Sequence, residues 1–242
     1  MNIAILLSGG VGRRIDTVIP KQYVRINGHM IVTYALKPLL GSSSIDMAYI
    51  VADEEWHEAV IEDVRETGLD TDKIMGFAVP GTNRQMSILN GMQEAIRDSK
   101  ALLETEFNYL NDTILIHDAA RPMLTERLIA DCFEALKEHD GVMPVLPMKD
   151  TVYMSEDGKG ISSLLDRKRV FAGQSPELFR FKKYYDANMS LMPDKILGIN
   201  GASEPAVMAG MDIVMIPGDE GNFKITTDAD MERYRGIMEG TA

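Results

Sequence analysis

Short apolar stretches alternate with amphipathic stretches over the first 145 residues, and this alternation restricts the fold more than any other feature of the sequence. Apolar runs of strand length occur at residues 3–7, 45–51, 74–79, 112–116 and 141–145. Helical periodicity separates them at residues 30–40 (with Gly41 as a stop), 54–67, 86–96 and 128–136. Strands and helices that alternate in this way form a mostly parallel sheet covered on both faces. We predict an α/β fold, and because there is no repeat or linker, a single domain over residues 1–242.

The pattern changes between Asp150 and Glu177. Residues 150–154 predict a strand, residues 157–160 a hairpin-like turn, and residues 166–174 are polar and basic without helical periodicity. We predict an arm over about residues 148–176, and because an arm this thin cannot bury its own core, we expect it to pack on a second copy in a homodimer. The remaining elements are predicted as a helix at 179–191, a short helix after 200–203, a strand at 212–216 and a closing helix capped by Thr227 with Asp230.

Composition excludes several classes of function. The formal net charge of -12 argues against a general nucleic-acid coat, which needs clustered Lys and Arg. No run of about eighteen apolar residues is present to span a membrane, and the N-terminus has no signal-peptide pattern. The single cysteine, Cys132, excludes an internal disulfide framework, and the four histidines show no metal-ligand spacing. A cytoplasmic enzyme that acts on small molecules fits these observations.

A glycine-rich turn follows the first predicted strand. Gly9, Gly10 and Gly12 allow the backbone to turn sharply and to expose its N–H groups to an anion. Basic residues accompany them at Arg13, Arg14 and Lys21. In an acidic chain this combination favours a triphosphate site, with Arg14 and Lys21 stabilising charge on the phosphates. The alternative is an ordinary strand-to-loop connection with solvated basic residues.

Two further polar segments also follow predicted strands, and ligands of such sheets bind beyond the carboxyl ends of the strands. Asp118 could orient a sugar hydroxyl, a water or a metal ion, or it could cap a loop. Arg84 and Ser87 could receive a base or a phosphate at a helix N-terminus, or serve as a surface cap. We predict that His117 supports its loop. Arg167 and Lys224, taken alone, are typical of solvated charge.

Seven groups of residues occur in the order found in one family: Leu7–Arg14 with Pro20–Tyr23, Gly81 with Arg84 and Ser87, His117–Pro122, Asp150-Thr151, Asp166-Arg167, Gln174–Pro176 and Asn222–Thr226. Nearly the whole chain therefore resembles the cytidylyltransferases that act on polyol phosphates. The branch that acts on 2-C-methyl-D-erythritol 4-phosphate in the non-mevalonate isoprenoid pathway matches best. The ribitol-5-phosphate branch of cell-surface polymer synthesis is the alternative.

The resemblance implies a Rossmann-like nucleotidyltransferase fold, CTP as donor, Mg²⁺ as cofactor and a homodimer joined through the arm. By position, Arg14 and Lys21 would stabilise the triphosphate, while Lys224 and the partner's Arg167 would position the acceptor phosphate. Contacts to the polyol are implied for Thr151 and Asp118. Contacts to the nucleotide are implied for Ser8, Gly9, Gly10, Gly12, Gly81, Thr82, Arg84 and Ser87. The Mg²⁺ would be held mainly by the CTP phosphates, with Asp118 as a further candidate ligand.

The sequence also departs from the family pattern. Ser8-Gly9 replace Ala-Ala or Ala-Gly, Thr82 replaces an Asp, and Asn200-Gly201 replace a Thr-Asp pair that lines the acceptor pocket. His117–Pro122 and Asp166-Arg167 favour the methylerythritol branch, whereas Gly9-Gly10, Trp56 and Gly173-Gln174 favour the ribitol branch. Two other functional classes stay open: a nicotinamide-dependent oxidoreductase, for which Asp53 lies near the end of the second strand, and a non-catalytic nucleotide-binding protein.

Overall fold

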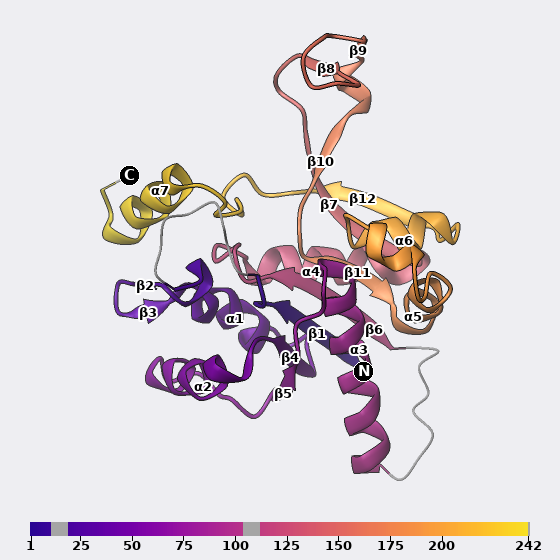
Figure 1. The fold of residues 1–242 in the computed structure, drawn as a ribbon. Helices are drawn as coiled ribbons and strands as arrows, with labels where there is room; N and C mark the ends of the chain where they lie inside the picture. Colours follow the sequence, from indigo (N-terminus) through magenta and orange to yellow (C-terminus); the bar gives the residue numbers. More distant parts are fainter. Residues whose placement is uncertain (11–18, 104–111, 242) are drawn as a thin grey trace.

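The computed structural model describes residues 1–10, 19–103 and 112–241. Its centre is an eight-stranded sheet in the order β10-β7-β11-β6-β1-β4-β5, with β12 paired to β7 (Figure 1). The strands are β1 (Asn2–Leu7), β4 (Met47–Val51), β5 (Ile74–Ala78), β6 (Thr113–Asp118), β7 (Gly141–Pro147), β10 (Phe171–Gly173), β11 (Glu177–Arg180) and β12 (Ile213–Pro217). The pairs β1–β4, β1–β6, β4–β5 and β7–β12 are parallel. The predicted α/β fold with a mostly parallel sheet is confirmed.

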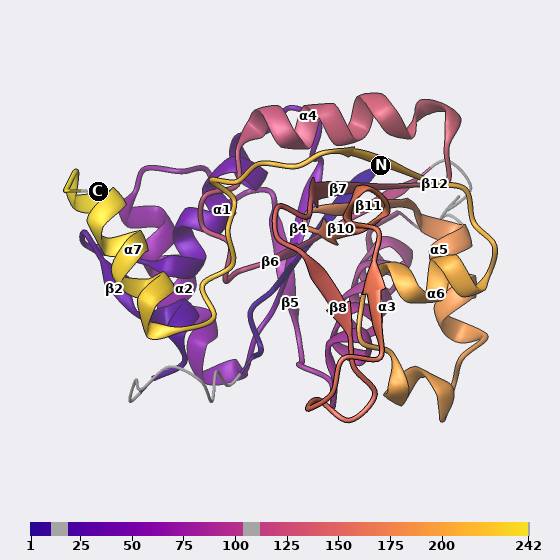
Figure 2. The same ribbon diagram turned by 90° about the horizontal axis from the view of Figure 1, so that it is seen from above.

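Helices cover both faces of the sheet (Figure 2). They are α1 (Ile31–Gly41), α2 (His57–Glu66), α3 (Arg84–Leu103), α4 (Glu126–Ala135), α5 (Phe181–Met189), α6 (Ser203–Met208) and α7 (Asp228–Glu239). Successive side chains of a strand point to opposite faces, so Ala4 and Leu6 pack with α1, α2 and α4, whereas Ile3 and Ile5 pack with α3, α5 and α6. The alternation of the first strand therefore contributes to two separate cores.

One predicted boundary needs correction. The helix expected from residue 179 begins at Phe181, and Glu177–Arg180 instead form β11, which pairs antiparallel with both β6 and β7. The helix expected to end at Gly41 does end there, with Gly41 as its last helical residue.

The arm is shorter than predicted. It projects from the sheet and contains the two-stranded ribbon of β8 (Val152–Met154) and β9 (Ser163–Leu165) (Figure 1). Its two limbs meet where Met148 N donates to Val170 O at 3.2 Å. Beyond that point residues 171–173 pair with β7, and residues 174–176 are buried. The projecting part therefore ends near residue 170.

A buried carboxylate, Asp63 on α2, connects three elements near the N-terminal half of the chain. Its Oδ2 accepts from Met30 N at 2.9 Å and from Thr33 Oγ1, and its Oδ1 lies 2.6 Å from Arg25 Nη1. Arg25 and His29 belong to the hairpin of β2 (Arg25–Ile26) and β3 (His29–Met30). Asp63 therefore holds this hairpin and the start of α1 against α2.

His29, Asp63 and Glu66 also place their ligand atoms within 4.8 Å of one another, a proximity that the sequence spacing did not predict. Arg25 lies within ion-pair distance of both carboxylates, 2.6 Å from Asp63 and 3.7 Å from Glu66. Its guanidinium therefore already supplies the positive charge that a metal ion would bring.

We expect Asp63→Ala to lower the free energy of unfolding by about 3 kcal/mol, because it leaves the polar groups around a fully buried carboxylate without their acceptor. For a chain of this size the melting temperature should fall by roughly 6–12 °C. Thermal unfolding measures this, with Glu62→Ala at the exposed neighbouring position as the control. Equal melting temperatures for the two variants would contradict the structural role of Asp63.

Candidate active site

The glycine-rich turn is fixed by the short 3₁₀ helix η1 (Lys21–Tyr23). Gln22 Nε2 donates to Ser8 O at 2.5 Å and to Gly10 O at 2.9 Å. Tyr23 Oη donates to Ser8 O at 3.0 Å, and burial raises the pKa of Tyr23 to about 12, so the phenol keeps its proton. Lys21, at the start of η1, is therefore held beside residues 8–10. Arg13, Arg14 and Gly12 lie outside the described residues.

Trp56 packs against a residue of this site. Its indole stacks on the Tyr23 ring with the ring centroids 4.1 Å apart and an angle of 10° between the planes. Trp56 follows the end of β4, whose Val51 O accepts from Ser8 N at 2.9 Å. The ends of β1 and β4 and the helix η1 therefore form one packed unit around Ser8.

The turn after β5 contacts the turn after β1. A Cβ on Gly9 would lie 2.4 Å from Pro80 Cγ, and a Cβ on Gly81 would lie 2.4 Å from Met86 Cβ, so both positions require glycine. Ser87 Oγ accepts from Gly81 N at 2.9 Å and donates to Asn83 O at 3.0 Å. The hydroxyl of Ser87 thus folds this turn onto the first turn of α3, while Thr82 is exposed.

Asp118, the last residue of β6, binds two cations from distant parts of the chain. Its Oδ1 accepts from Arg84 Nη2 at 3.0 Å and from Nε at 3.2 Å, and its Oδ2 lies 2.8 Å from Lys224 Nζ. Although burial opposes the charge, Arg84 and then Lys224 hold the pKa of Asp118 well below its usual range. Leu7 pairs with Asp118, so this ion cluster adjoins the glycine-rich turn. The sequence indicates Arg84, Asp118 and Lys224 as site residues, but it does not predict that they contact one another.

His117 supports its loop, as predicted. The side chain is fully buried, with Nε2 3.0 Å from Arg121 O and Nδ1 3.2 Å from Ser175 Oγ. Desolvation lowers the pKa of His117 to about 4, so the ring is neutral at pH 7. Arg121 in turn donates from Nη1 to Asn222 O at 2.7 Å and thereby fixes the segment that contains Lys224.

Asp118 is a candidate Mg²⁺ ligand in the sequence analysis, and that role stays a prediction. Its oxygens already accept from cationic side chains, Oδ1 from Arg84 and Oδ2 from Lys224, so a metal ion would compete with these cations for the carboxylate. Any Mg²⁺ in this site is better held by the phosphates of the nucleotide.

The structure does not bring every predicted residue to this cluster. Thr151 is exposed at the start of the arm. Arg167 follows β9, and its Nη1 donates across the arm to Lys149 O at 2.9 Å. Asn200 is exposed, with its N–H donating to Glu204 Oε2 at 2.9 Å. Within the described part of the chain, Arg167 and Asn200 therefore hydrogen-bond to residues outside the Asp118 cluster.

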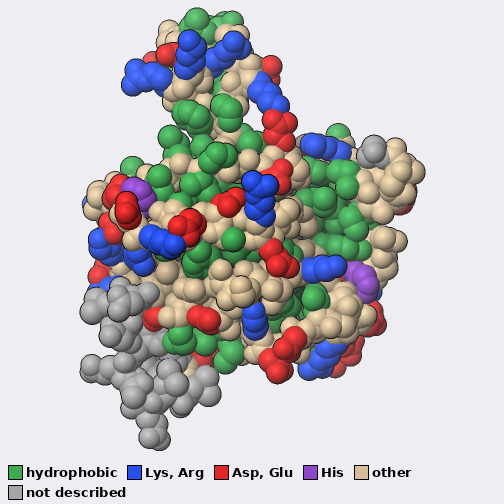
Figure 3. All heavy atoms as spheres, turned by 180° about the vertical axis from the view of Figure 1, so that it is seen from behind, with side chains coloured by type: hydrophobic (Ala, Val, Ile, Leu, Met, Phe, Trp, Pro, Cys, Tyr) green, Lys and Arg blue, Asp and Glu red, His purple; other side chains and the backbone are tan. Residues whose placement is uncertain are grey.

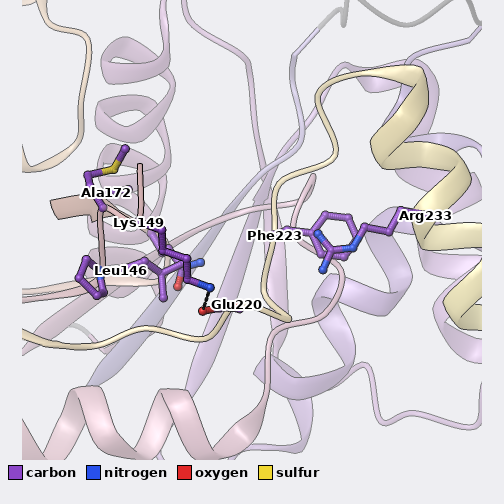
Figure 4. Close-up of a pocket in the computed structure, with 9 residues that line it drawn as sticks. Leu146, Lys149, Ala172, Glu220, Phe223 and Arg233 are labelled. Carbon is purple, nitrogen blue, oxygen red and sulfur yellow. Dashed lines mark ion pairs between the residues drawn. The ribbon is translucent and has the colours of Figure 1, made fainter. Parts of the chain in front are cut away.

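A cavity of about 340 Å³ lies at the base of the arm (Figure 4). One wall holds the Lys149–Glu220 ion pair, and another holds Phe223 with the Arg233 guanidinium 4.0 Å from its ring centroid. Phe223 precedes Lys224 in the chain, so this cavity borders the ion cluster without including it.

Three functional side chains escaped the sequence analysis. Gln22 and Tyr23 were noted only as part of a motif, although their polar groups fix the turn. Glu177 lies 3.7 Å from Arg84 Nη2 and was placed at the boundary of the arm. The sequence signal that could have identified Glu177 is its place directly before the apolar pair Leu178-Phe179. An acidic residue there indicates a carboxylate at the end of a buried strand.

Comparisons with known proteins agree on one family. The model of the family described as 2-C-methyl-D-erythritol 4-phosphate cytidylyltransferase (IspD) matches residues 2–240. An enzyme of that name from Thermotoga neapolitana is 29% identical over 99% of this chain and 97% of its own. A ribitol-5-phosphate cytidylyltransferase from Streptococcus agalactiae is 28% identical over 99% and 96%. The crystal structure of 4-diphosphocytidyl-2C-methyl-D-erythritol synthase from Anaerococcus prevotii superposes with a TM-score of 0.78 at 22% identity, covering 98% of this chain and 96% of the other.

Proposed function

This chain belongs to the IspD family of cytidylyltransferases, and on that premise we propose that it transfers CMP from CTP to a polyol phosphate, with 2-C-methyl-D-erythritol 4-phosphate as the first-choice acceptor. The family makes the chain a nucleotidyltransferase. The nicotinamide-dependent alternative has no support among these relatives, and Asp53 is exposed ahead of Trp56 rather than part of the cluster.

The observation that supports this proposal most is the meeting of Arg84 and Lys224 at Asp118, beside a glycine-rich turn that η1 holds in place. Cations near the phosphates and an acceptor held in line are what nucleotidyl transfer requires. In the proposed reaction an oxygen of the acceptor phosphate attacks the α-phosphorus of CTP, and the bond to the β-phosphate breaks to release pyrophosphate. Lys21 would stabilise charge on the triphosphate, and Lys224 would orient the acceptor phosphate.

We propose Mg²⁺ as the cofactor, held mainly by the CTP phosphates. When bound, the ion would offset the charge of the triphosphate. In this proposal, the backbone N–H groups of Gly9 and Gly10 and the side chain of Lys21 are the groups by which this chain itself binds and orients the donor. Ser87 acts on the nucleotide indirectly, by fixing the Gly81 turn.

Ribitol 5-phosphate is the second candidate acceptor, because ribitol-5-phosphate cytidylyltransferases match at 28% identity and Asn200-Gly201 replace the usual Thr-Asp pair. To decide between the acceptors, pyrophosphate release is measured with CTP and each of three polyol phosphates: 2-C-methyl-D-erythritol 4-phosphate, ribitol 5-phosphate and erythritol 4-phosphate. The acceptor with the highest kcat/KM is the preferred substrate. If none of these acceptors leads to pyrophosphate release, the chain would be better explained as a non-catalytic nucleotide-binding protein. Stronger thermal stabilisation by NAD than by CTP would overturn the proposal itself.

We further propose a homodimer formed through the arm. The arm exposes Tyr153, Met154, Ile161 and Leu164, and Figure 3 shows hydrophobic and basic side chains together on this projection. Ile161 is 69% exposed and Leu164 is 65% exposed, which is costly for a two-stranded ribbon that stands alone in water. A second copy would cover these side chains and could bring its own Arg167 toward the acceptor phosphate.

For the double variant Ile161→Glu, Leu164→Glu we expect a monomer in light scattering at a protein concentration where the unchanged chain is a dimer. Charged side chains at two central apolar positions oppose burial in an interface. Leu197→Glu, at a 55% exposed position outside the arm, is the control and should stay dimeric. A dimer that survives the double variant would place the interface elsewhere.

No helix within the described residues is long and apolar enough to cross a membrane. Because the proposed substrates are small water-soluble phosphates, we propose that the enzyme works in the cytoplasm.

A further inference from the structure

Glu177 faces the ion cluster from a strand that the sequence analysis missed. On β11 it pairs with Ile116 of β6, so it is a diagonal neighbour of Asp118 on the same face of the sheet. Both carboxyl groups thus face the first turn of α3, where Arg84 lies. Arg84 Nη2 is 3.0 Å from Asp118 Oδ1 and 3.7 Å from Glu177 Oε2. One guanidinium is shared unequally by two carboxyl groups.

The second carboxyl group is poorly satisfied. Glu177 is 8% exposed, and among the described residues its Oε2 has no hydrogen-bond partner. A buried acceptor in this state destabilises the charged form. Charged and titratable groups face it from every packed element: Arg84 from α3, Asp118 and Arg121 from the end of β6, Lys224 from the segment before α7, and Tyr184 from α5.

These groups respond differently to pH near neutrality. Burial raises the pKa of Glu177 to about 7, whereas the pKa of Asp118 is held well below its usual range by its two cations. Burial also raises the pKa of Tyr184, so the phenol stays neutral. Three cations therefore face one ionised carboxylate below pH 7, and two carboxylates above it.

We propose that Glu177 is a positioning residue that adjusts the charge of the phosphate site. Because Glu177 interacts with the Arg84 guanidinium that also binds Asp118, its ionisation state sets the net positive charge that a bound phosphate meets at Arg84 and Lys224. The neutral carboxyl group leaves the cluster more positive and favours the anion. The ionised carboxylate competes with the anion for the same cations. This inference rests on the proposed function only in assigning that anion to a substrate.

Sulfate is a suitable probe, because it stays a dianion between pH 6 and 8 and adds no titration of its own. We expect its affinity for the unchanged protein, measured by thermal shift and calorimetry, to fall about fivefold from pH 6 to pH 8, the lower end of ordinary coupling between sites. Glu177→Gln keeps the size and cannot ionise, so its affinity should change less than twofold. Lys224→Ala should lose this sulfate binding, which identifies the site.

The matched control is Glu138→Gln. Glu138 is exposed in the 3₁₀ helix η3 (Leu136–Glu138), which precedes the amino end of β7, whereas the ion cluster lies at the carboxyl end of β6. The substitution changes the net charge equally. It should keep the fivefold fall. If Glu177→Gln does not fold, calorimetry of the unchanged protein at pH 7 in two buffers of different ionisation enthalpy should still show proton uptake on sulfate binding.

Parallel pH dependence in the unchanged protein and Glu177→Gln would overturn the inference, as would sulfate binding that does not depend on Lys224 or that takes up no proton. With substrates, the variant should lower KM for the acceptor at pH 8 with little change in kcat. If the chain proves inactive with every polyol phosphate, the proposed function fails while the sulfate result still stands. If the chain is active but sulfate binding shows the same pH dependence in Glu177→Gln, the inference on Glu177 fails while the proposed function stands.

Discussion

Lys21→Ala is expected to reduce turnover by roughly two orders of magnitude, the scale of losing one preorganised group that stabilises developing charge. Lys21 begins η1, whose Gln22 and Tyr23 bind the backbone of Ser8. Its ammonium group is thereby held where the triphosphate is proposed to bind. Because the proposed role of the ammonium group is to stabilise charge during the reaction, the loss should appear mainly in kcat. Pyrophosphate release under saturating CTP and acceptor measures it.

Lys37→Ala is the matched control, since it removes the same charge from an exposed position of α1. It should retain nearly full turnover. Lys21→Arg keeps the charge but changes its geometry, so we expect an intermediate rate. Turnover within a fewfold of the unchanged enzyme for Lys21→Ala would remove the proposed triphosphate site from this end of the sheet.

Asp118→Asn is expected to lower the free energy of unfolding by about 3 kcal/mol at pH 7, because it leaves Arg84 and Lys224 close together without the carboxylate that binds both. Two cations that no longer share an anion should also lose their orientation, so turnover should fall by at least tenfold. Since the pKa of Asp118 is depressed in the folded state, its stabilisation is present above the ordinary aspartate pKa and is lost as pH falls. Chemical denaturation at pH 7 and at about pH 3, below the ordinary aspartate pKa, measures the loss.

Asp212→Asn provides the comparison, because it removes an exposed carboxylate whose Oδ2 lies 2.8 Å from His139 Nδ1. Surface pairs contribute about 0–1 kcal/mol, so a small change is expected. Glu177→Gln should have the opposite effect on the free energy of unfolding. The pKa of Glu177 is raised in the folded state, so its charge destabilises the fold as pH rises toward 7 and its neutral replacement should stabilise it there. Equal effects of the Asp118 and Glu177 substitutions would show that the two carboxyl groups are equivalent after all.

Most of the sheet could be predicted because its parallel strands are continuous apolar runs bounded by turns, as in residues 3–7 and 112–116. β11 could not. Its apolar pair, Leu178-Phe179, is followed at once by Phe181 and Tyr184, which have helical spacing, and four residues are too few to show a period of their own. Its antiparallel place between β6 and β7 depends on tertiary contacts. β10 was missed for the same reason, since it is three residues long.

The sequence could predict which residues belong to the candidate site, but not which of them contact one another. Glycines at positions 9 and 81 follow strands, and His117 and Asp118 end one, so their location beyond the carboxyl ends of the sheet strands follows from topology alone. The ion pairs of Asp118 join residues 34 and 106 positions apart, and no local pattern contains such a distance. The sequence showed the carboxylate of Asp118 but not the two cations that it binds, and its contact with Mg²⁺ stays a prediction.

The return of the chain from the arm has a consequence for how the protein tolerates insertions and deletions. β10 pairs with β7 immediately before Gln174, and Ser175 Oγ then accepts from Asp118 N at 3.2 Å. Extra residues at the tip, between β8 and β9, leave that register untouched. A single residue added between 171 and 174 would turn each following side chain to the wrong side, and the Ser175 hydroxyl would no longer accept from the backbone N–H of Asp118. Natural length variation in this protein's relatives should therefore be concentrated at the tip and absent from the return strand.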